Sequence, residues 1–181
     1  MIQWIEQPPD FRHFPLGDLF TTLSFTAALQ LIAGESTALR VVVSSTVMGG
    51  IYTHLSQQNI EMGGLLVGRV FKDDDTFRVV LVEAFVPSSE FRGTGVSLRM
   101  GTSLWDEARI AQTSGQSVIG WYHSHPNLGA FFSGTDRRTQ AAFFTQAHSL
   151  GLVVDPIRAE EMWFSGPASG QLSASQVVST P

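Results

Sequence analysis

Cysteine is absent from all 181 residues of the sequence. This absence excludes disulfide bonds, thiol nucleophiles and cysteine-ligated zinc sites, and it fits a reducing compartment. The amino terminus also lacks the basic start and apolar run of a signal peptide, and no segment is apolar for long enough to span a bilayer. We therefore expect a cytoplasmic protein.

Basic residues are few as well. The chain has 11 lysines and arginines against 16 aspartates and glutamates, which gives a formal net charge of -5. Lysine and arginine form no run, so we expect neither nucleic acid nor a membrane as a partner. An apolar fraction of 43% with four tryptophans is typical of a folded chain, and the length suits one domain.

Composition divides the chain into three parts. We predict an N-terminal extension that precedes or packs on the core, the core domain itself, and a flexible tail, over residues 1–39, 40–165 and 166–181. The tail is rich in small and polar residues, which favours fraying. Within the extension, residues 21–34 are apolar, and their periodicity is compatible with either a helix or a strand.

Strands alternate with helices in the core. Apolar runs and turn residues predict strands over 40–45, 63–73, 76–87, 117–125 and 150–157, with another short strand near Leu98. Helical spacing and capping residues predict helices over 45–59, 103–114 and 135–149. The second and third of these strands form an antiparallel hairpin around Asp73, Asp74 and Asp75. The sequence therefore predicts the α/β class, with a mixed sheet flanked by helices.

A pair of histidines stands at the end of the buried strand 117–125. Side chains alternate between the faces of an extended chain, so His123 and His125 point the same way, and Pro126 keeps His125 extended. Asp136 lies near the start of the next helix, whose dipole favours the ionised, metal-binding carboxylate. Two imidazoles and one carboxylate leave one position of a tetrahedral zinc site open for water, which is typical of a catalytic site.

Each of these features has a simpler interpretation when it is taken alone. The paired histidines can serve as hydrogen-bonding groups at a strand end, and Ser133 with Asp136 can be a helix cap. The combination of the histidine pair, Pro126, Ser133 and Asp136 is much less expected by chance. Capping and catalysis are also compatible roles for Ser133.

The stretch HSHPNLGAFFSGTD, residues 123–136, resembles the JAMM signature of the MPN+ metalloproteases, which is H-x-H-P, six residues, then S-x-x-D. Every defined position matches. Upstream, EMGGLLVG (61–68) is similar to the family's glutamate followed by a small and aliphatic run that ends in glycine. VVDP (153–156) resembles the strand after the motif helix. The resemblance covers about residues 40–157 and implies the MPN/JAB fold, a mixed sheet of the cytidine-deaminase-like kind.

The resemblance also implies the roles of five residues in a catalytic domain. His123, His125 and Asp136 would hold one Zn²⁺, with water in the fourth position. Glu61 would take a proton from that water and pass it to the leaving amine, while Ser133 would stabilise the oxyanion. Ser124 should face away from the metal and is outside this set, and the three other histidines lack partners at ligand spacing.

Enzymes of this family remove ubiquitin or ubiquitin-like proteins from amines, or trim the tails of such proteins, after a terminal glycine. The segment 87–103 occupies the place of the family's first insertion, and we expect it to bind the substrate tail as an added strand. The compact chain resembles bacterial stand-alone members, which implies a deconjugase of a bacterial ubiquitin-like modifier. Processing of a sulfur-carrier ubiquitin-like protein, or a non-catalytic MPN scaffold or binding module, are the alternatives. The sequence predicts no oligomeric state.

Overall fold

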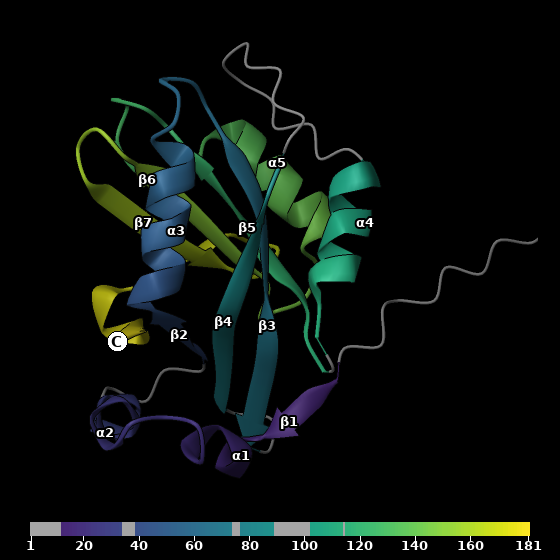
Figure 1. Cartoon of the computed structure of the whole chain (residues 1–181), viewed down its shortest axis with the longest axis vertical. Coiled ribbons are helices and arrows are strands. Elements are labelled where there is room, and N and C mark those ends of the chain that lie inside the picture. The colour runs from purple at the N-terminus through teal and green to yellow at the C-terminus, as the bar shows by residue number, and fades with distance from the viewer. Residues whose placement is uncertain (1–11, 34–38, 74–76, 89–101, 114) are drawn as a thin grey trace, which may run out of the picture.

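A single mixed sheet of nine strands lies at the centre of the described part of the molecule (Figure 1). The computed structural model describes residues 12–33, 39–73, 77–88, 102–113 and 115–181. Its strands are β1 (His13–Pro15), β2 (Leu39–Ser44), β3 (Gly63–Asp73), β4 (Phe77–Pro87), β5 (Ser117–Ser124), β6 (Leu150–Asp155), β7 (Glu160–Ser165), β8 (Gly170–Gln171) and β9 (Val177–Thr180). They lie in the order β8-β7-β6-β5-β3-β4-β2-β9, and β1 pairs with β3.

Helices flank this sheet, so the predicted α/β class with a mixed sheet is confirmed. In the described ranges they are α1 (Leu16–Phe20), α2 (Phe25–Ala33), α3 (Ser45–Leu55), α4 (Thr102–Ala111) and α5 (Gly134–Phe143), and a 3-10 helix (Ala174–Gln176) precedes β9. None of the helices that the structure describes is both long enough and apolar enough to cross a membrane.

The strand directions bring separate parts of the sequence to one edge of the sheet. β3 and β4 form the predicted antiparallel hairpin, β5 runs antiparallel to β3, and β6 runs parallel to β5. The carboxyl ends of β5 and β6 therefore lie beside the amino end of β3. Residues that follow β5, follow β6 or precede β3 meet at this edge, far apart though they are in the sequence.

The sheet has an apolar cluster on each face, as the alternation of side chains along strands requires. One cluster lies under α3 and includes Ile51, Leu55 and Tyr122. A second cluster lies on the opposite face and includes Leu104 of α4 and Trp121 of β5. Trp121 and Tyr122 are neighbours in β5, so this strand is buried on both faces. Such burial explains why the middle of β5, residues 118–122, contains only glycine and apolar or aromatic residues.

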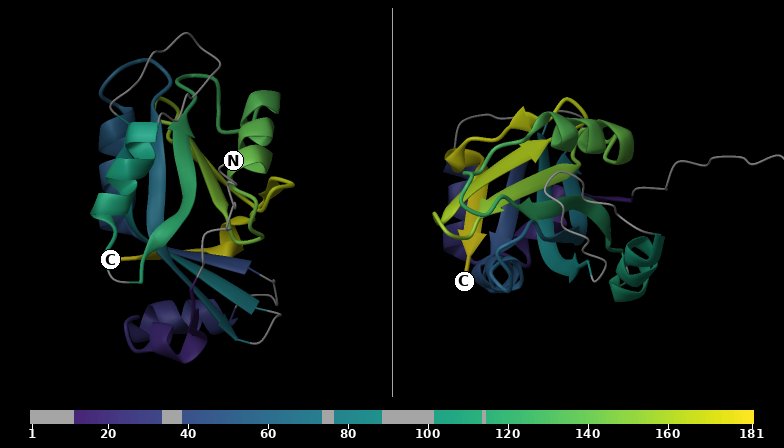
Figure 2. Two further views of the ribbon diagram at one scale, coloured as in Figure 1. Left: turned by 90° about the vertical axis from the view of Figure 1, so that its right-hand side faces the viewer. Right: turned by 90° about the horizontal axis from the view of Figure 1, so that it is seen from above.

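The ambiguous segment 21–34 is mainly helical. α1 and α2 are separated near Ser24, whose hydroxyl accepts a hydrogen bond from the N–H of Ala27 at 3.2 Å. Both helices lie at the end of the molecule away from α5 (Figure 2). Leu19 and Leu31 are buried there in a third apolar cluster, together with side chains of β2, β3, β4 and β9.

The prediction that residues 166–181 fray is wrong. β9 pairs in parallel with β2, in a register that runs from Val41↔Val177 to Ser44↔Thr180. Val178 is buried in the cluster around α1 and α2. The main-chain groups along one side of β2 need partners, and β9 provides them while burying an apolar side chain. The small residues just before β9 concealed this short strand in the sequence.

Three predicted helices end earlier than expected, at Leu55, Ala111 and Phe143. The clearest case is α5, which was predicted to continue to residue 149. Phe144 leaves helical geometry with φ −118° and ψ 64°, and its side chain is buried against the sheet. Tertiary burial of an aromatic ring thus overrides helix propensity. β7 and β8 were not predicted, and the short strand expected near Leu98 lies outside the described residues.

Asp155 is the last residue of β6, and its side chain connects the loop that follows β5 with the loop that follows β6. Its fully buried carboxylate accepts hydrogen bonds from the N–H groups of Asn127 at 3.0 Å and Gly129 at 2.8 Å. It also accepts bonds from the N–H groups of Ile157 at 3.0 Å and Arg158 at 3.2 Å. Burial opposes ionisation, but these four donors lower the pKa of Asp155 to about 2.

We predict that Asp155→Asn destabilises the protein by about 2–4 kcal/mol at pH 7, because an amide offers one acceptor where a carboxylate offers two and turns an NH₂ group toward buried donors. The folded pKa lies below the ordinary value, so the contribution of the carboxylate is complete above about pH 4 and is lost as the pH falls toward 2. The difference in free energy of unfolding between wild type and Asp155→Asn should therefore become smaller as the pH falls from about 4 toward 2.

Urea unfolding at pH 7 and pH 2.5, with chelator present throughout, measures this difference. Asp106→Asn is the matched control, because Asp106 is exposed and pairs with the Arg109 side chain at 3.0 Å. It should change the free energy of unfolding by less than about 0.5 kcal/mol. Equal stabilities of Asp155→Asn and wild type at pH 7 would contradict the assigned role.

Candidate metal centre

β5 and the loop after it carry the two histidines of the motif. Trp121 and His123 share the face of β5 that looks toward α5, as alternation requires. His125 follows the strand, and its N–H bonds to the carbonyl of Val154 in β6 at 3.0 Å. The two Nε2 atoms lie 3.2 Å apart. Both side chains are at least 95% buried, so their predicted convergence is confirmed by the geometry.

Asp136 reaches the histidines from the first turn of α5. Ser133 is the N-cap of this helix, and its hydroxyl accepts a bond from the N–H of Asp136 at 3.2 Å. In return, Oδ2 of Asp136 accepts a bond from the N–H of Ser133 at 2.6 Å. Oδ1 lies 3.3 Å from Nε2 of His123, and Oδ2 lies 3.6 Å from Nε2 of His125. This capping box holds the carboxylate in place.

The charge states of these groups suit a cation. Burial opposes ionisation of Asp136, but the contact with His123 and the bonds from Ser133 hold the pKa of its carboxyl well below its usual range. Burial, assisted by His123 and only partly opposed by Asp136, lowers the pKa of His125 to about 4. Asp136 is therefore anionic and His125 neutral at pH 7, and these are the forms that bind metals.

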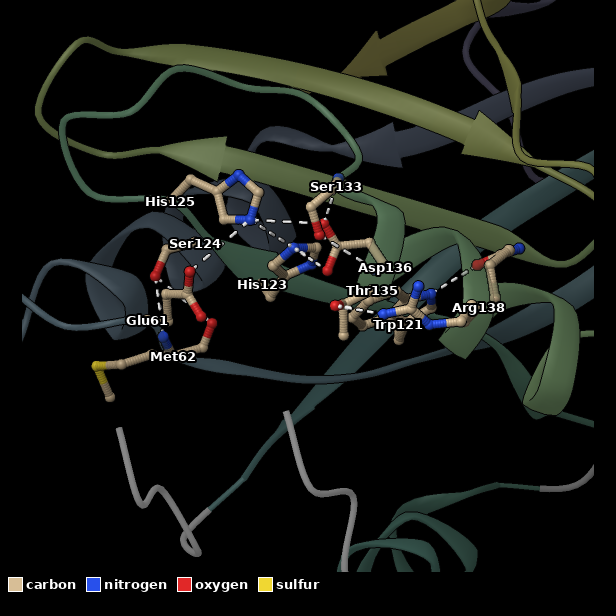
Figure 3. Close-up of polar contacts among 11 residues, drawn as sticks. Glu61, Met62, Trp121, His123, Ser124, His125, Ser133, Thr135, Asp136 and Arg138 are labelled. Carbon is tan, nitrogen blue, oxygen red and sulfur yellow. Dashed lines mark hydrogen bonds and ion pairs between the residues drawn. The ribbon is translucent and has the colours of Figure 1, made fainter. Parts of the chain in front are cut away.

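The spacing of the donors also fits a metal. Bonds of about 2.0–2.1 Å arranged tetrahedrally around zinc place neighbouring donor atoms about 3.3 Å apart. The two Nε2 atoms lie 3.2 Å apart, and each lies close to one carboxylate oxygen of Asp136, His123 to Oδ1 at 3.3 Å and His125 to Oδ2 at 3.6 Å. Figure 3 shows His123, His125 and Asp136 pointing toward one another. All three ligand atoms lie within 4.8 Å of each other, so these residues can hold one metal ion.

Aromatic packing orients the imidazoles. The Nδ1 atoms of both histidines are buried without a hydrogen-bond partner in the described structure. The ring of Trp121 stacks on that of His123, with centroids 4.5 Å apart and an interplanar angle of 6°. The ring of Phe131 lies 4.8 Å from that of His125. Stacking on Trp121 thus supports the ring of His123, whereas the ring of Phe131 is tilted by 53° against that of His125.

Gln140 holds the stacking partner and was missed by sequence reasoning. Its Oε1 accepts a hydrogen bond from Nε1 of Trp121 at 2.6 Å, and its Nε2 donates to the carbonyls of Ser149 and Gly166, both at 3.2 Å. Gln140 is fully buried one helical turn after Asp136. A polar residue at that i+4 position, on the same inward face of the helix, was the signal available in the sequence.

Glu61 lies beside the three donors without belonging to their group. The β3–β5 register pairs Gly63 with His123, which continues to place Glu61 opposite His125. Oε1 of Glu61 is 4.0 Å from Nε2 of His125, and its side chain is 24% exposed. Burial raises the pKa of Glu61, the neighbouring carboxylate of Asp136 adds to this, and His123 opposes it. A carboxylate with a raised pKa beside a metal position is suited to proton transfer.

Ser124, the three other histidines and the two phenylalanines of the motif loop are not among the metal donors. Ser124 is on the opposite face of β5, as predicted, and contacts Met62. Nδ1 of His54 lies 2.9 Å from the hydroxyl of Tyr122 under α3, and His13 contacts His148, with ring centroids 5.5 Å apart.

Of the two phenylalanines in the motif loop, Phe132 is buried and stacks on Phe164, whereas Phe131 is 45% exposed beside His125. Asp74 and Asp75 lie outside the described residues.

Comparison with known proteins places the chain in a family. A sequence profile of prokaryotic homologs of the JAB domain matches residues 46–164. The chain is 39% identical over 105 residues to the Saccharomyces cerevisiae protein named Ubiquitin carboxyl-terminal hydrolase RPN11, covering 55% of this chain and 33% of the relative. It is 35% identical over 130 residues to 26S proteasome non-ATPase regulatory subunit 14 of Drosophila melanogaster, covering 68% of this chain and 40% of the relative. The chain thus spans less than half the length of these relatives.

The fold agrees with the profile. The solution structure of a Desulfitobacterium hafniense protein superimposes with a TM-score of 0.58 at 19% identity, and the match covers 77% of this chain and 92% of the other. This match concerns the fold alone. The profile covers more than half of the chain, and its range contains the histidine pair, Ser133, Asp136 and Glu61. The chain therefore belongs to the JAB/MPN, or JAMM, family, as one of the prokaryotic homologs of the JAB domain.

Proposed function

We propose that the protein is a zinc-dependent isopeptidase or peptidase that cleaves after the C-terminal glycine of ubiquitin or a ubiquitin-like protein. The observation that carries the proposal is the convergence of His123, His125 and Asp136 at zinc-like spacing, with Glu61 at the edge of the group. The name of the yeast relative, a ubiquitin carboxyl-terminal hydrolase, supports the bond that is cleaved.

The types of donor atom at this site suit zinc. Two imidazole nitrogens and one carboxylate oxygen form a set that suits Zn²⁺ and leaves one tetrahedral position for water or substrate. A zinc ion bound there would act as a Lewis acid, and it would lower the pKa of water enough to provide a nucleophile near neutral pH. His123, His125 and Asp136 hold the ion, and the capping box and the Trp121 stack keep these three side chains in position.

Two other residues handle protons and charge. Glu61 accepts a proton from the attacking water and delivers it to the leaving amine, a role that its raised pKa favours. The hydroxyl of Ser133 accepts a bond from the N–H of Asp136, which leaves its own proton available for the developing oxyanion. The position of Ser133 at the N-terminus of α5 adds the positive end of the helix dipole.

The substrate we propose is a conjugate or fusion of a bacterial ubiquitin-like modifier. The prokaryotic character of the matching family supports this choice. Tail processing of a sulfur-carrier protein uses the same chemistry and is the alternative enzyme function. A non-catalytic scaffold is disfavoured because all three donors, Glu61 and Ser133 are present. The proposed tail-binding segment 87–103 lies mostly outside the described residues, and its role stays a prediction.

The purified chain should contain about one zinc per molecule by mass spectrometry. Asp136→Asn removes the anionic ligand while keeping the size of the side chain, so we expect zinc content to fall at least about tenfold. Asp18→Asn, at an exposed position in the first turn of α1, is the control and should retain the metal. A variant at Asp136 that binds zinc as wild type does would remove this residue from the ligand set.

Glu61→Gln should retain zinc and lose about 100- to 10,000-fold in kcat, because the amide cannot accept the proton of water. The rate is measured with a panel of ubiquitin and ubiquitin-like proteins that end in Gly-Gly and carry a C-terminal aminocoumarin or a linear fusion partner. Chelator should abolish wild-type cleavage, and added zinc should restore it. Wild-type hydrolysis rates in Glu61→Gln would refute the assignment of the base.

Ser133→Ala should lower kcat by about 100- to 1,000-fold through loss of the oxyanion donor. The same substitution removes a helix cap, which costs about 1 kcal/mol of stability. Ser44→Ala separates the two effects, because Ser44 caps α3 through a bond from the N–H of Val47 at 3.2 Å and lies outside the site. If Ser44→Ala slows cleavage as much as Ser133→Ala, the loss reflects capping and not catalysis.

A further inference from the structure

We propose that Ser124 is a positioning residue that places Glu61 for proton transfer. This inference rests on the proposed function of the site. Ser124 stands between the two histidines in the sequence, but its side chain lies on the opposite face of β5 and is fully buried. Figure 3 shows it directed toward Met62, next to Glu61. The histidines thus hold the metal position on one face while the serine between them acts on the other.

Ser124 binds the chain on both sides of Glu61. Its N–H donates to the carbonyl of Met62 at 2.8 Å, and its Oγ accepts a bond from the N–H of Met62 at 3.0 Å. The same Oγ lies 3.4 Å from the carbonyl oxygen of Ile60 and 3.5 Å from that of Met62, and its one proton can be donated to either. Residues 60 and 62 are therefore both attached to one side chain. Glu61 is the residue between them.

The hydroxyl replaces a main-chain partner at this point. In a regular antiparallel pair, the N–H of Met62 would bond to the carbonyl of Ser124. Here the N–H of Met62 bonds to the side-chain Oγ of Ser124, while the N–H of His125 continues the parallel pairing with β6 by bonding to the carbonyl of Val154 at 3.0 Å. The side chain of Ser124 thus acts as the acceptor in place of its own carbonyl. It extends the β3–β5 connection by one residue beyond Gly63, the first residue of β3.

This extension matters because Glu61 precedes β3. Residues 56–60 are turn and bend structure, so no strand ladder fixes the main chain on that side of Glu61. The carboxylate stands 4.0 Å from Nε2 of His125, at the end of three rotatable bonds. A small shift of the main chain at residue 61 moves the carboxylate further, and displacements near 1 Å cost about 100-fold in rate in enzymes. A hydrogen bond to each neighbour of Glu61 suppresses that shift.

The test compares Ser124→Ala with two other variants in the full, zinc-loaded chain. Ser124→Thr keeps the hydroxyl and adds a methyl group that strands tolerate. Ser44→Ala also removes a hydroxyl that accepts one main-chain N–H bond, but it does so at the start of α3. The substrate is the ubiquitin-like fusion on which the wild type is most active. Zinc content, kcat, KM and the hydrogen exchange of the Met62 amide are measured for each.

Ser124→Ala should keep one zinc per chain and change KM less than about twofold, while kcat falls about 10- to 100-fold. Exchange of the Met62 amide should accelerate at least about tenfold, because its acceptor is gone. Ser124→Thr should restore kcat to within about fivefold of wild type, and Ser44→Ala should change neither kcat nor Met62 exchange by more than about twofold. In a Glu61→Gln background, Ser124→Ala should lower the residual rate no further.

Several results would overturn the proposal. These are a wild-type kcat or an unchanged Met62 exchange rate in Ser124→Ala, loss of zinc from that variant, or an equal fall in rate in the Glu61→Gln background. If Ser124→Thr does not fold, the contrast between Ser124→Ala and Ser44→Ala decides. If the wild type cleaves no member of the panel, the proposed function fails separately, and Met62 exchange alone decides whether Ser124 holds this segment.

Discussion

The antiparallel register between β3 and β5 is the constraint on which the rest of the site depends. It pairs Gly63 with His123 and so brings Glu61 opposite His125. The neighbouring residues Met62 and Ser124, which are hydrogen-bonded, are 62 positions apart in the sequence. A slip of one residue in β5 would turn both histidines to the face covered by α3 and turn Ser124 to the metal position. Burial on both faces of β5 makes such a slip unfavourable, because Trp121 and Tyr122 each fill a different apolar cluster.

α5 completes the site by using one set of bonds for two purposes. The reciprocal bonds between Ser133 and Asp136 satisfy main-chain donors at the start of the helix, and they also hold the carboxylate beside His123. One turn later, Gln140 fastens the helix to β5 through Trp121, whose ring supports His123. The polar groups of the centre are therefore held in place by contacts within the protein. Such preorganisation lowers the reorganisation needed when a cation binds or charge develops in a reaction.

Asp155 and Ser124 hold main-chain segments in place at the same edge of the sheet. Asp155 holds the loop that follows His125, and Ser124 holds the segment that contains Glu61. Each uses a buried acceptor to capture main-chain N–H groups that leave regular strand pairing. A sheet edge where strands both begin and end has many such groups. The geometry at this edge thus depends on side chains that are not among the three metal donors.

Local pattern was enough to predict much of this protein. The alternating and apolar runs predicted β2 to β6, alternation placed His123 and His125 on one face, and capping placed Ser133 and Asp136 at a helix start. These local features could be predicted because strand alternation and helix capping are properties of a few consecutive residues, whereas Glu61 was indicated only by the family resemblance. The helix ends and β9 were mispredicted, because the burial of Phe144 and Val178 depends on contacts that are distant in sequence.

By itself, the sequence determined which side chains share a face and which residues cap a helix, since both follow from backbone geometry over a few positions. Only the tertiary structure decided that Glu61 stands beside His125, that Gln140 supports Trp121, and that Ser124 and Asp155 capture N–H groups from other segments. Those relations depend on strand register and on the direction in which the chain leaves each strand. No local pattern contains either quantity, because both are set by which segments pack together.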